Sequence, residues 1–214
     1  MCELKDFSHL TREERLECLS SYWTIFVNSD DGDKDAFACI YKLSIDDLYS
    51  YGLSLGADED TCEDIIHEMF CTLYSKHEQL GHINNAMGYM IKSVRNKLMN
   101  IRKHYARITD DDPAMIPFAA DVTVTDHLIN EEEREKVKHT VEQLLRELTP
   151  RQREAIYLRY MQNLEYDEIA KMMDMNVDSV RKLVYRAFTT MRRHDLHNIP
   201  FILILLTLSQ HISI

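Results

Sequence analysis

Six basic side chains fall within residues 81–109, a stretch that contains no aspartate or glutamate. They are Lys92, Arg95, Lys97, Arg102, Lys103 and Arg107. Such a cluster can neutralise phosphates, because lysine and arginine release the counterions that surround a nucleic acid. Tyr89 and Asn96 stand among them, and aromatic and amide groups can contact unpaired bases. The chemistry indicated is binding of a polyanion.

A second basic group lies near the end of the chain. It combines basic and other polar residues: Ser179, Arg181, Lys182, Tyr185 and Arg186, followed by Thr189, Arg192 and Arg193. Arginine or lysine in the major groove can donate to guanine, and each good bidentate contact contributes about 1–3 kcal/mol of discrimination. This group could therefore read base edges as well as bind phosphates.

The net charge of −11 is unusual for a protein that binds nucleic acid, but the charges are segregated. Residues 1–80 carry 18 acidic and 6 basic side chains, in contrast to residues 81–109. Local charge, not the total, decides what a surface attracts. The asymmetry suggests one surface for a basic protein partner and another for a polyanion. The alternative is an acidic protein with one ordinary basic helix.

Apolar residues recur through the first basic cluster at spacings of three and four. They are Ile91, Val94, Leu98, Ile101, Tyr105 and Ile108. This spacing predicts one continuous α-helix with a single buried stripe. The six basic residues are expected on the remaining faces, which leaves a cationic surface free to bind.

The second basic group follows the pattern of a helix-turn-helix. Thr149 before Pro150 predicts an N-cap, and the helix should continue to about Tyr160. A short helix is expected over residues 166–173, and Asp174 and Asn176 then bracket a tight turn.

The last helix of this group has apolar residues on its inner face: Val177, Val180, Val184, Ala187 or Phe188, and Met191. The basic group occupies its outer face, and in helix-turn-helix proteins this second helix enters the major groove. Two alternatives remain. The block could be a three-helix core with a solvated charged face, or belong to a repressor or a response-regulator output domain.

Only five glycines and four prolines occur, which favours helices over a β architecture rich in turns. We therefore predict an all-α fold of two helical domains joined by a flexible linker, the second domain being the helix-turn-helix. The predicted parts are an N-terminal helical extension over 1–27, a first domain over 28–108, a linker over 109–135, the second domain over 136–195, and an apolar tail over 196–214.

Enzymatic, metal-binding and secreted classes find little support in the sequence. The five cysteines (Cys2, Cys18, Cys39, Cys62 and Cys71) form no CxxC pair and no zinc-ligand spacing with the histidines, and are expected to be buried or half-buried thiols in a reducing cytosol. No nucleophile–base arrangement, paired carboxylates or glycine-rich phosphate loop occurs. We expect a cytoplasmic protein with no catalytic residues, metal, cofactor, signal peptide or transmembrane segment.

Both blocks together resemble the extracytoplasmic-function (ECF) group of the sigma-70 family of RNA polymerase sigma factors. The segments LTPRQREAIYLRY, LEYDEIAKMM and VDSVRKLVYRA are similar to the family's domain four. The segments CEDIIHEMF (62–70) and YMIKSVRNK (89–97) are similar to its domain two. The resemblance covers roughly residues 34–108 and 136–194, and the order and separation of the motifs make it specific.

The resemblance implies that the chain binds core RNA polymerase, through the clamp helices of the largest subunit and the flap region, and directs it to promoter DNA. The residues implied for polymerase binding are Glu63, Asp64, Ile66, His67 and Phe70. Those implied for the minus-ten element are Tyr89, Lys92, Arg95, Asn96, Lys97, Arg102 and Lys103, and for the minus-thirty-five element Ser179, Arg181, Lys182, Tyr185 and Arg186.

Some positions depart from the family pattern. Asp174 replaces the usual turn glycine, Glu165 takes the place of a serine or threonine N-cap, and Leu183 stands where many members have a basic residue. Asn100 stands where many members carry aspartate, and Cys62 where alanine is preferred. The change at Leu183 affects the expected minus-thirty-five sequence preference.

Several alternatives remain open. Glu63 and Asp64 could form a solvated helix face, and Tyr89 could belong to the core. The tail over 199–214 could pack on the second domain, bind an anti-sigma factor or other regulatory protein, or touch a membrane surface. The whole chain could instead be a DNA-binding regulator that acts without polymerase, or an adaptor with a vestigial helix-turn-helix.

Overall fold

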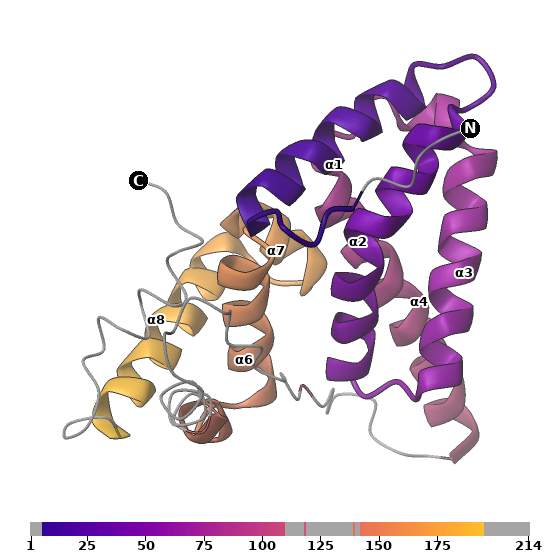
Figure 1. The fold of residues 1–214 in the computed structure, drawn as a ribbon. Helices are drawn as coiled ribbons and strands as arrows, with labels where there is room; N and C mark the ends of the chain where they lie inside the picture. Colours follow the sequence, from indigo (N-terminus) through magenta and orange to yellow (C-terminus); the bar gives the residue numbers. More distant parts are fainter. Residues whose placement is uncertain (1–5, 110–117, 119–138, 140–141, 195–214) are drawn as a thin grey trace. The chain divides into compact units, whose positions relative to one another are not determined.

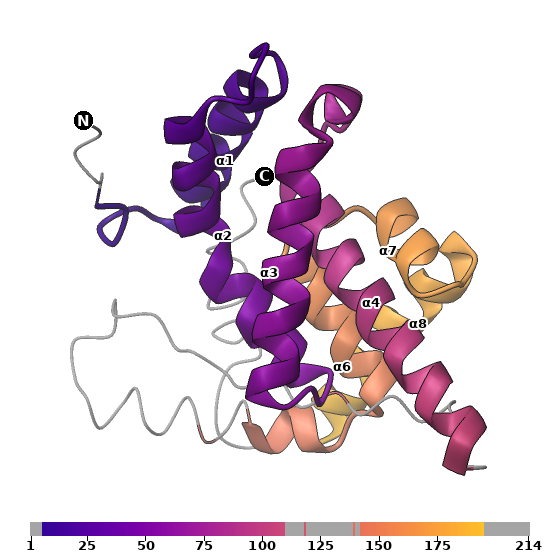
Figure 2. The same ribbon diagram turned by 90° about the vertical axis from the view of Figure 1, so that its right-hand side faces the viewer.

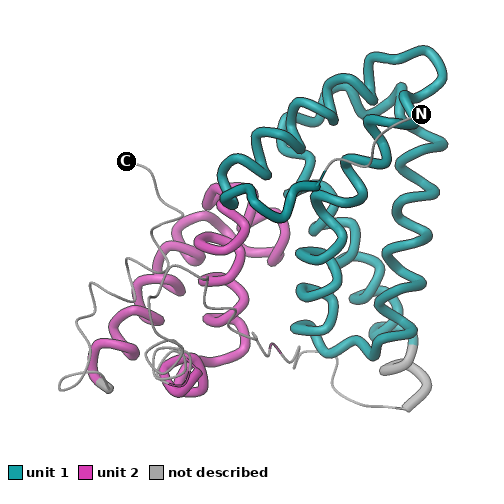
Figure 3. The backbone as a smooth tube through the Cα atoms, in the orientation of Figure 1, with its two compact units in different colours: residues 1–115 teal, residues 116–214 magenta. Residues whose placement is uncertain are grey.

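The computed structural model describes residues 6–109, 118, 139 and 142–194. The chain divides into two compact units, residues 1–115 and 116–214 (Figure 3). Every regular element in the described part is helical (Figure 1), which confirms the predicted all-α class. The predicted tail, and the predicted linker apart from residues 109 and 118, lie outside the described residues.

The first unit is a helical bundle. Its elements are α1 (Arg12–Val27), α2 (Lys34–Ser54), α3 (Glu59–Ser75), the short 3₁₀ helix η1 (His77–Leu80) and α4 (Ala86–Thr109). Helix α2 packs against α1, α3 and α4, and α4 also contacts α1 and α3 (Figure 2). Because α4 has neighbours on three sides, a wide arc of its surface is buried.

Side-chain caps explain where the first three helices begin. Thr11 and Glu14 form a reciprocal capping box at the start of α1. The Asp33 carboxylate accepts a hydrogen bond from the Ala36 amide at 2.7 Å, and Asp58 accepts one from Thr61 at 2.8 Å. Each cap satisfies backbone N–H groups that the first turn leaves without helical partners.

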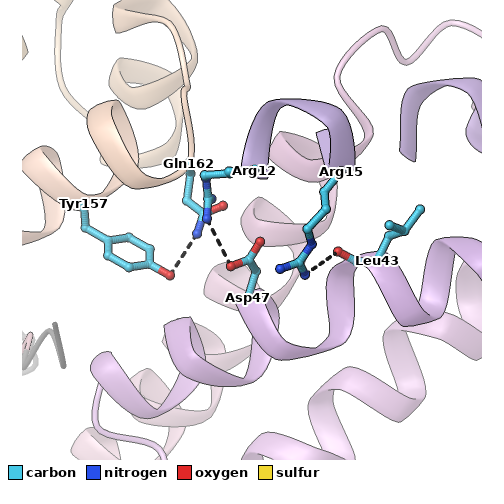
Figure 4. Close-up of polar contacts among 6 residues, drawn as sticks. All are labelled: Arg12, Arg15, Leu43, Asp47, Tyr157 and Gln162. Atoms are coloured by element: carbon cyan, nitrogen blue, oxygen red, sulfur yellow. Dashed lines mark hydrogen bonds and ion pairs between the residues drawn. The ribbon is translucent and has the colours of Figure 1, made fainter. Parts of the chain in front are cut away.

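Helix α1 belongs to the core of the first unit. Leu19, Trp23 and Phe26 are buried, and burying each such side chain contributes about 1.5–3 kcal/mol. Figure 4 shows Arg12 paired with Asp47 of α2 at 3.4 Å, and the Arg15 guanidinium donating to the Leu43 carbonyl at 3.3 Å. The predicted boundary after residue 27 therefore falls inside a compact unit, because the turn-forming residues 28–33 connect two packed helices.

Helices α2 and α3 approach closely at Gly52. A Cβ atom at this position would collide with the Sγ atom of Cys62. Burial raises the pKa of Cys62 to about 11, so this thiol stays protonated at neutral pH. Cys39 is buried and Cys18 half-buried, as expected, whereas Cys71 is exposed on the outer face of α3.

The second unit contains a helical segment over residues 142–146 and the helix-turn-helix. Its named elements are α6 (Pro150–Ile156), a π-helical turn η2 (Tyr157–Met161), α7 (Tyr166–Met172) and α8 (Val177–His194). Helix α8 packs against both α6 and α7. Leu158, Ile169 and Val180 are among the residues that lie fully buried between these helices.

Predicted local features of the second unit are present. Thr149 caps α6 in a reciprocal box with Gln152, and Asn176 caps α8 by accepting from the Ser179 amide at 2.8 Å. Asp174 adopts a left-handed conformation with φ of 53°, a region that aspartate tolerates better than most residues. Glu165 is the N-cap of α7 in place of serine or threonine, and its own amide donates to the Glu168 carboxylate at 2.9 Å.

Helix α6 was expected to continue to about Tyr160, but it widens into the π-turn after Ile156. The Gln162 side chain, which is buried just beyond this turn, donates to the Tyr157 hydroxyl at 2.9 Å (Figure 4). Within the described residues, no helix combines the length and the apolar character needed to cross a bilayer.

Candidate nucleic-acid interface

The exposed side chains among those described in α8 are Asp178, Arg181, Lys182, Tyr185, Arg186, Arg192 and Arg193. Tyr185 is 72% exposed, which is unusual for a tyrosine without a partner surface. Ser179 is half-buried at the start of the same helix. The structure thus brings together all five residues predicted for the second basic site, and three of them carry positive charge.

Packing of the opposite face fixes this orientation of α8. Val180, Val184, Ala187 and Met191 are buried at spacings of four, three and four. This helical period places the basic residues away from the core. Leu183, which replaces a basic residue of the family pattern, is half-buried between the two faces.

Helix α4 carries the first basic cluster and shows a mixed outcome. Ile91, Val94 and Leu98 are buried, as the periodicity predicted. The exposed residues form one stripe along the helix at spacings of four, four and three. They are Lys92, Asn96, Asn100 and Lys103, and His104 is exposed beside the last of them. Tyr89 is half-buried one turn before this stripe, with its ring centroid 6.2 Å from that of Trp23. The side chain of Arg107 lies outside those described.

Three basic residues of α4 are engaged by the first unit itself. Arg95 is only 5% exposed. Arg102 donates to the Leu55 carbonyl at the end of α2, and burial lowers its pKa. Lys97 pairs with Glu68 of α3 at 2.5 Å. The expectation that all the basic residues of α4 are free to bind a polyanion is therefore corrected.

The spacing along α4 explains this correction. Arg95 lies four residues after Ile91 and three before Leu98, while Arg102 lies four after Leu98. Both arginines therefore belong to the helix face that packs against the rest of the unit. Counting spacings from the buried apolar residues could have revealed this from sequence, but only if α4 were known to have neighbours on three sides.

Helix α3 separates the five residues implied for polymerase binding into two sets. Glu63, Asp64 and His67 are exposed on its outer face. Ile66 and Phe70 are 2% and 4% exposed and lie in the core, so their side chains are not available to a partner in this conformation. They occupy the apolar stripe of an amphipathic helix, which the sequence motif alone did not distinguish from its solvent face.

Further residues near these three were not predicted. Glu59, Asp60 and Glu68 extend the acidic face along α3. On α2, Tyr41 is 44% exposed, and its ring centroid lies 4.8 Å from that of Phe70. A search for acidic residues at helical spacing could have found the first group, whereas Tyr41 depends on how α2 and α3 pack.

The packing of α6, α7 and α8, with a basic outer face on α8, is that of a helix-turn-helix protein of the DNA-binding class. Residues 138–191 match the family described as "Sigma-70, region 4". Sequence relatives extend the similarity beyond this block. The chain is 25% identical over 150 residues to the ECF RNA polymerase sigma factor SigM of Bacillus subtilis (strain 168), a match that covers 69% of this chain and 88% of the relative.

A second relative is the ECF RNA polymerase sigma factor BldN of Streptomyces coelicolor, with 26% identity over 171 residues, 76% of this chain and 61% of the relative. Among solved structures, the sigma factor RpoE from Bartonella quintana, crystallised with the anti-sigma factor NepR, shares the fold with a TM-score of 0.51. That match has 18% identity and covers 74% of this chain and 96% of the other. The match over residues 138–191 and the two sequence relatives confirm the resemblance to the ECF group of the sigma-70 family.

Proposed function

We propose that the chain is a sigma factor that binds core RNA polymerase and directs it to promoters for initiation of transcription. The observation that carries this proposal is the combination of a family-matched helix-turn-helix with an exposed basic face and a preceding helical unit with separate acidic and basic surfaces. A protein that binds DNA alone has no evident use for the acidic face of α3.

Polymerase binding is assigned to the exposed residues of α3. Glu63, Asp64 and His67 stand on an outer face with a net negative charge, which suits a basic partner surface and speeds encounter by electrostatic attraction. Tyr41, beside the buried Phe70, is a candidate aromatic anchor at the edge of this surface. Ile66 and Phe70 contribute by holding α3 in the bundle.

Contact with the minus-ten element is assigned to the exposed stripe of α4. Lys92 and Lys103 can neutralise phosphates, while Asn96 and the half-buried Tyr89 can contact bases. Lys97 would join them when it leaves Glu68. Arg95 and Arg102, in contrast, stabilise the unit that presents the stripe.

Contact with the minus-thirty-five duplex is assigned to α8. Its first turns carry Ser179, Arg181 and Lys182, and the N-terminal residues of a recognition helix lie nearest the base edges. Arg186 and Tyr185 follow on the same exposed face. Leu183 cannot supply the charge found at its position in many relatives, so specificity depends on its neighbours.

Each surface is modest, and we expect the free chain to bind promoter DNA weakly and with strong salt dependence. Joined on the polymerase, the units act on one DNA molecule at high effective concentration, provided that the spacing of the elements fits. This cytoplasmic role requires no catalytic activity from the chain itself. An anti-sigma factor or other regulatory protein is a further candidate partner.

Reconstituted transcription tests the proposal. Core polymerase supplemented with the full chain should initiate at discrete sites on genomic DNA fragments, whereas core polymerase alone should not. The paired variants Glu63→Lys with Asp64→Lys should reduce initiation, since they reverse the charge of the assigned polymerase surface. A chain that binds specific DNA tightly without polymerase, and that leaves initiation unchanged, would instead support the alternative of an independent regulator.

A fragment used in such experiments must include α1. Removing residues 1–27 would expose the surfaces that Leu19, Trp23 and Phe26 cover. A failure of residues 28–108 to bind polymerase would then report unfolding and not the absence of an interface. The full chain is therefore the appropriate reagent.

A further inference from the structure

One aromatic ring in the second unit lies against two arginine side chains from different elements. Tyr166 is the first residue of α7. The guanidinium carbon of Arg159, from η2, is 4.9 Å from the ring centroid, and that of Arg181, from α8, is 5.6 Å from it. Both distances fall within the roughly 6 Å over which a cation is attracted to an aromatic face.

The two arginines differ in what else holds them. Arg159 donates to the Leu164 carbonyl at 2.8 Å and pairs with the Glu165 carboxylate at 3.0 Å, so it is committed to the fold. Arg181 has Asp178 at 3.8 Å, beyond ordinary hydrogen-bond length, and its side chain is 61% exposed. Most of the five guanidinium donors of Arg181 therefore remain available to a ligand.

We infer that Tyr166 is a positioning residue for Arg181, holding its guanidinium ready to donate to promoter DNA. This inference rests on the proposed function and deepens it for one contact of the minus-thirty-five surface. An aromatic ring attracts the flat face of a guanidinium, whereas hydrogen bonds leave from its edge. The ring can thus restrict the side chain without using the groups that would read DNA.

Restricting Arg181 before binding matters because a long side chain loses rotamer freedom when DNA immobilises it. A contact already present in the free protein reduces that loss. The fold also holds the ring of Tyr166 in place. Its neighbour Arg159 is fixed by the ion pair with Glu165, and Tyr166 is the first residue of α7. The elements η2, α7 and α8 therefore converge on the orientation of one DNA-facing side chain.

The ring and the hydroxyl of Tyr166 can be tested separately. Burial raises the pKa of Tyr160 to about 12, with a smaller contribution from Tyr166, so the phenol of Tyr160 stays neutral at physiological pH. The substitution Tyr166→Phe removes only the hydroxyl and retains the aromatic face. The substitution Tyr166→Leu retains apolar bulk and removes that face.

The experiment uses holoenzyme assembled from core polymerase and the full chain. A duplex library randomised across the minus-thirty-five region yields a selected probe, on which the affinities of Y166F, Y166L, R181A and the double variant Y166L/R181A are compared. We expect Y166F to bind like the wild type and Y166L to lose about two- to five-fold, the range of an exposed cation–π contact. In the R181A background, Y166L should cause no further loss.

Two outcomes would overturn the inference and can be told apart. If Y166L weakens binding equally with and without Arg181, or does not weaken it at all, the ring does not act through Arg181. If R181A itself has no effect on the selected probe, the assignment of Arg181 to DNA fails, and the role of Tyr166 fails with it. Circular dichroism melting of each variant shows whether the second unit remains folded.

Discussion

Helices α4 and α8 both carry clusters of basic residues, but the two units use those residues differently. In α8, the three cations predicted to face DNA are exposed, and the opposite face alone packs on the unit. In α4, Arg95 is buried and Arg102 is bonded to the end of α2. A helix that packs on one side leaves its charges free, whereas a helix enclosed on three sides recruits some of them into the fold.

The comparison shows that the number of basic residues on a helix overstates the positive charge that it presents at its surface. What counts is the subset that lies off the packed arc, which for α4 is a stripe including Lys92 and Lys103. Arginine suits the boundary of such an arc, because its aliphatic stem packs while its guanidinium reaches a polar partner.

The largest effect is expected from removing the buried charge of α4. The substitution Arg95→Met should lower the free energy of unfolding of the first unit by about 2–4 kcal/mol, because the groups that Arg95 contacts inside the fold lose their partner. Trp23 is the only tryptophan and is buried in this unit, so its fluorescence during urea unfolding reports the change directly. The matched control Lys92→Met, on the exposed stripe of the same helix, should remain within about 0.5 kcal/mol of wild type.

A smaller loss of stability is expected for Arg102→Met. The Leu55 carbonyl would lose its side-chain donor, which costs about 1–3 kcal/mol when no other partner replaces it. The same tryptophan-monitored unfolding provides the measurement. If Arg102 were instead a phosphate contact only, stability would not change and holoenzyme binding to DNA would weaken.

The salt dependence of DNA binding should separate the exposed cations from the engaged ones. For preformed holoenzyme, Lys182→Ala and Arg186→Ala should each reduce the slope of log affinity against log salt by about 0.9 if each contacts one phosphate of duplex DNA. Arg102→Met should leave the slope unchanged. Equal slopes for all three variants and the wild type would remove the proposed distinction between α4 and α8.

The smallest effect is expected at the Lys97–Glu68 pair. Glu68 is largely exposed, and pairs of this kind contribute about 0–1 kcal/mol. The substitution Glu68→Gln should therefore change the stability of the first unit little while releasing Lys97, so that preformed holoenzyme binds DNA slightly more tightly. A weaker DNA complex would indicate that Lys97 needs Glu68 to reach its position.

Much of the fold could be predicted from the sequence because it depends on local signals. Spacings of three and four gave the buried faces of α4 and α8, and the caps at Thr149 and Asn176 formed as expected. The left-handed turn at Asp174 followed from the residue type. Such features involve only neighbours in sequence, so one segment suffices to recognise them.

Features that depend on tertiary packing could not be predicted in the same way. The place of α1 in the first unit depends on how Trp23 and Phe26 fit against other helices. The burial of Ile66 and Phe70 depends on which face of α3 meets α2, since a family motif includes both faces. The π-turn after Ile156 has no signal that we recognise in the sequence.

Binding of the purified full chain to core RNA polymerase tests the central claim most directly. We predict a one-to-one complex by equilibrium titration, weakened at least ten-fold by Glu63→Lys with Asp64→Lys, while the basic variants of α8 retain their affinity for core enzyme. If core enzyme does not bind the unmodified chain, the proposed sigma-factor role is wrong, even if the helix-turn-helix binds DNA.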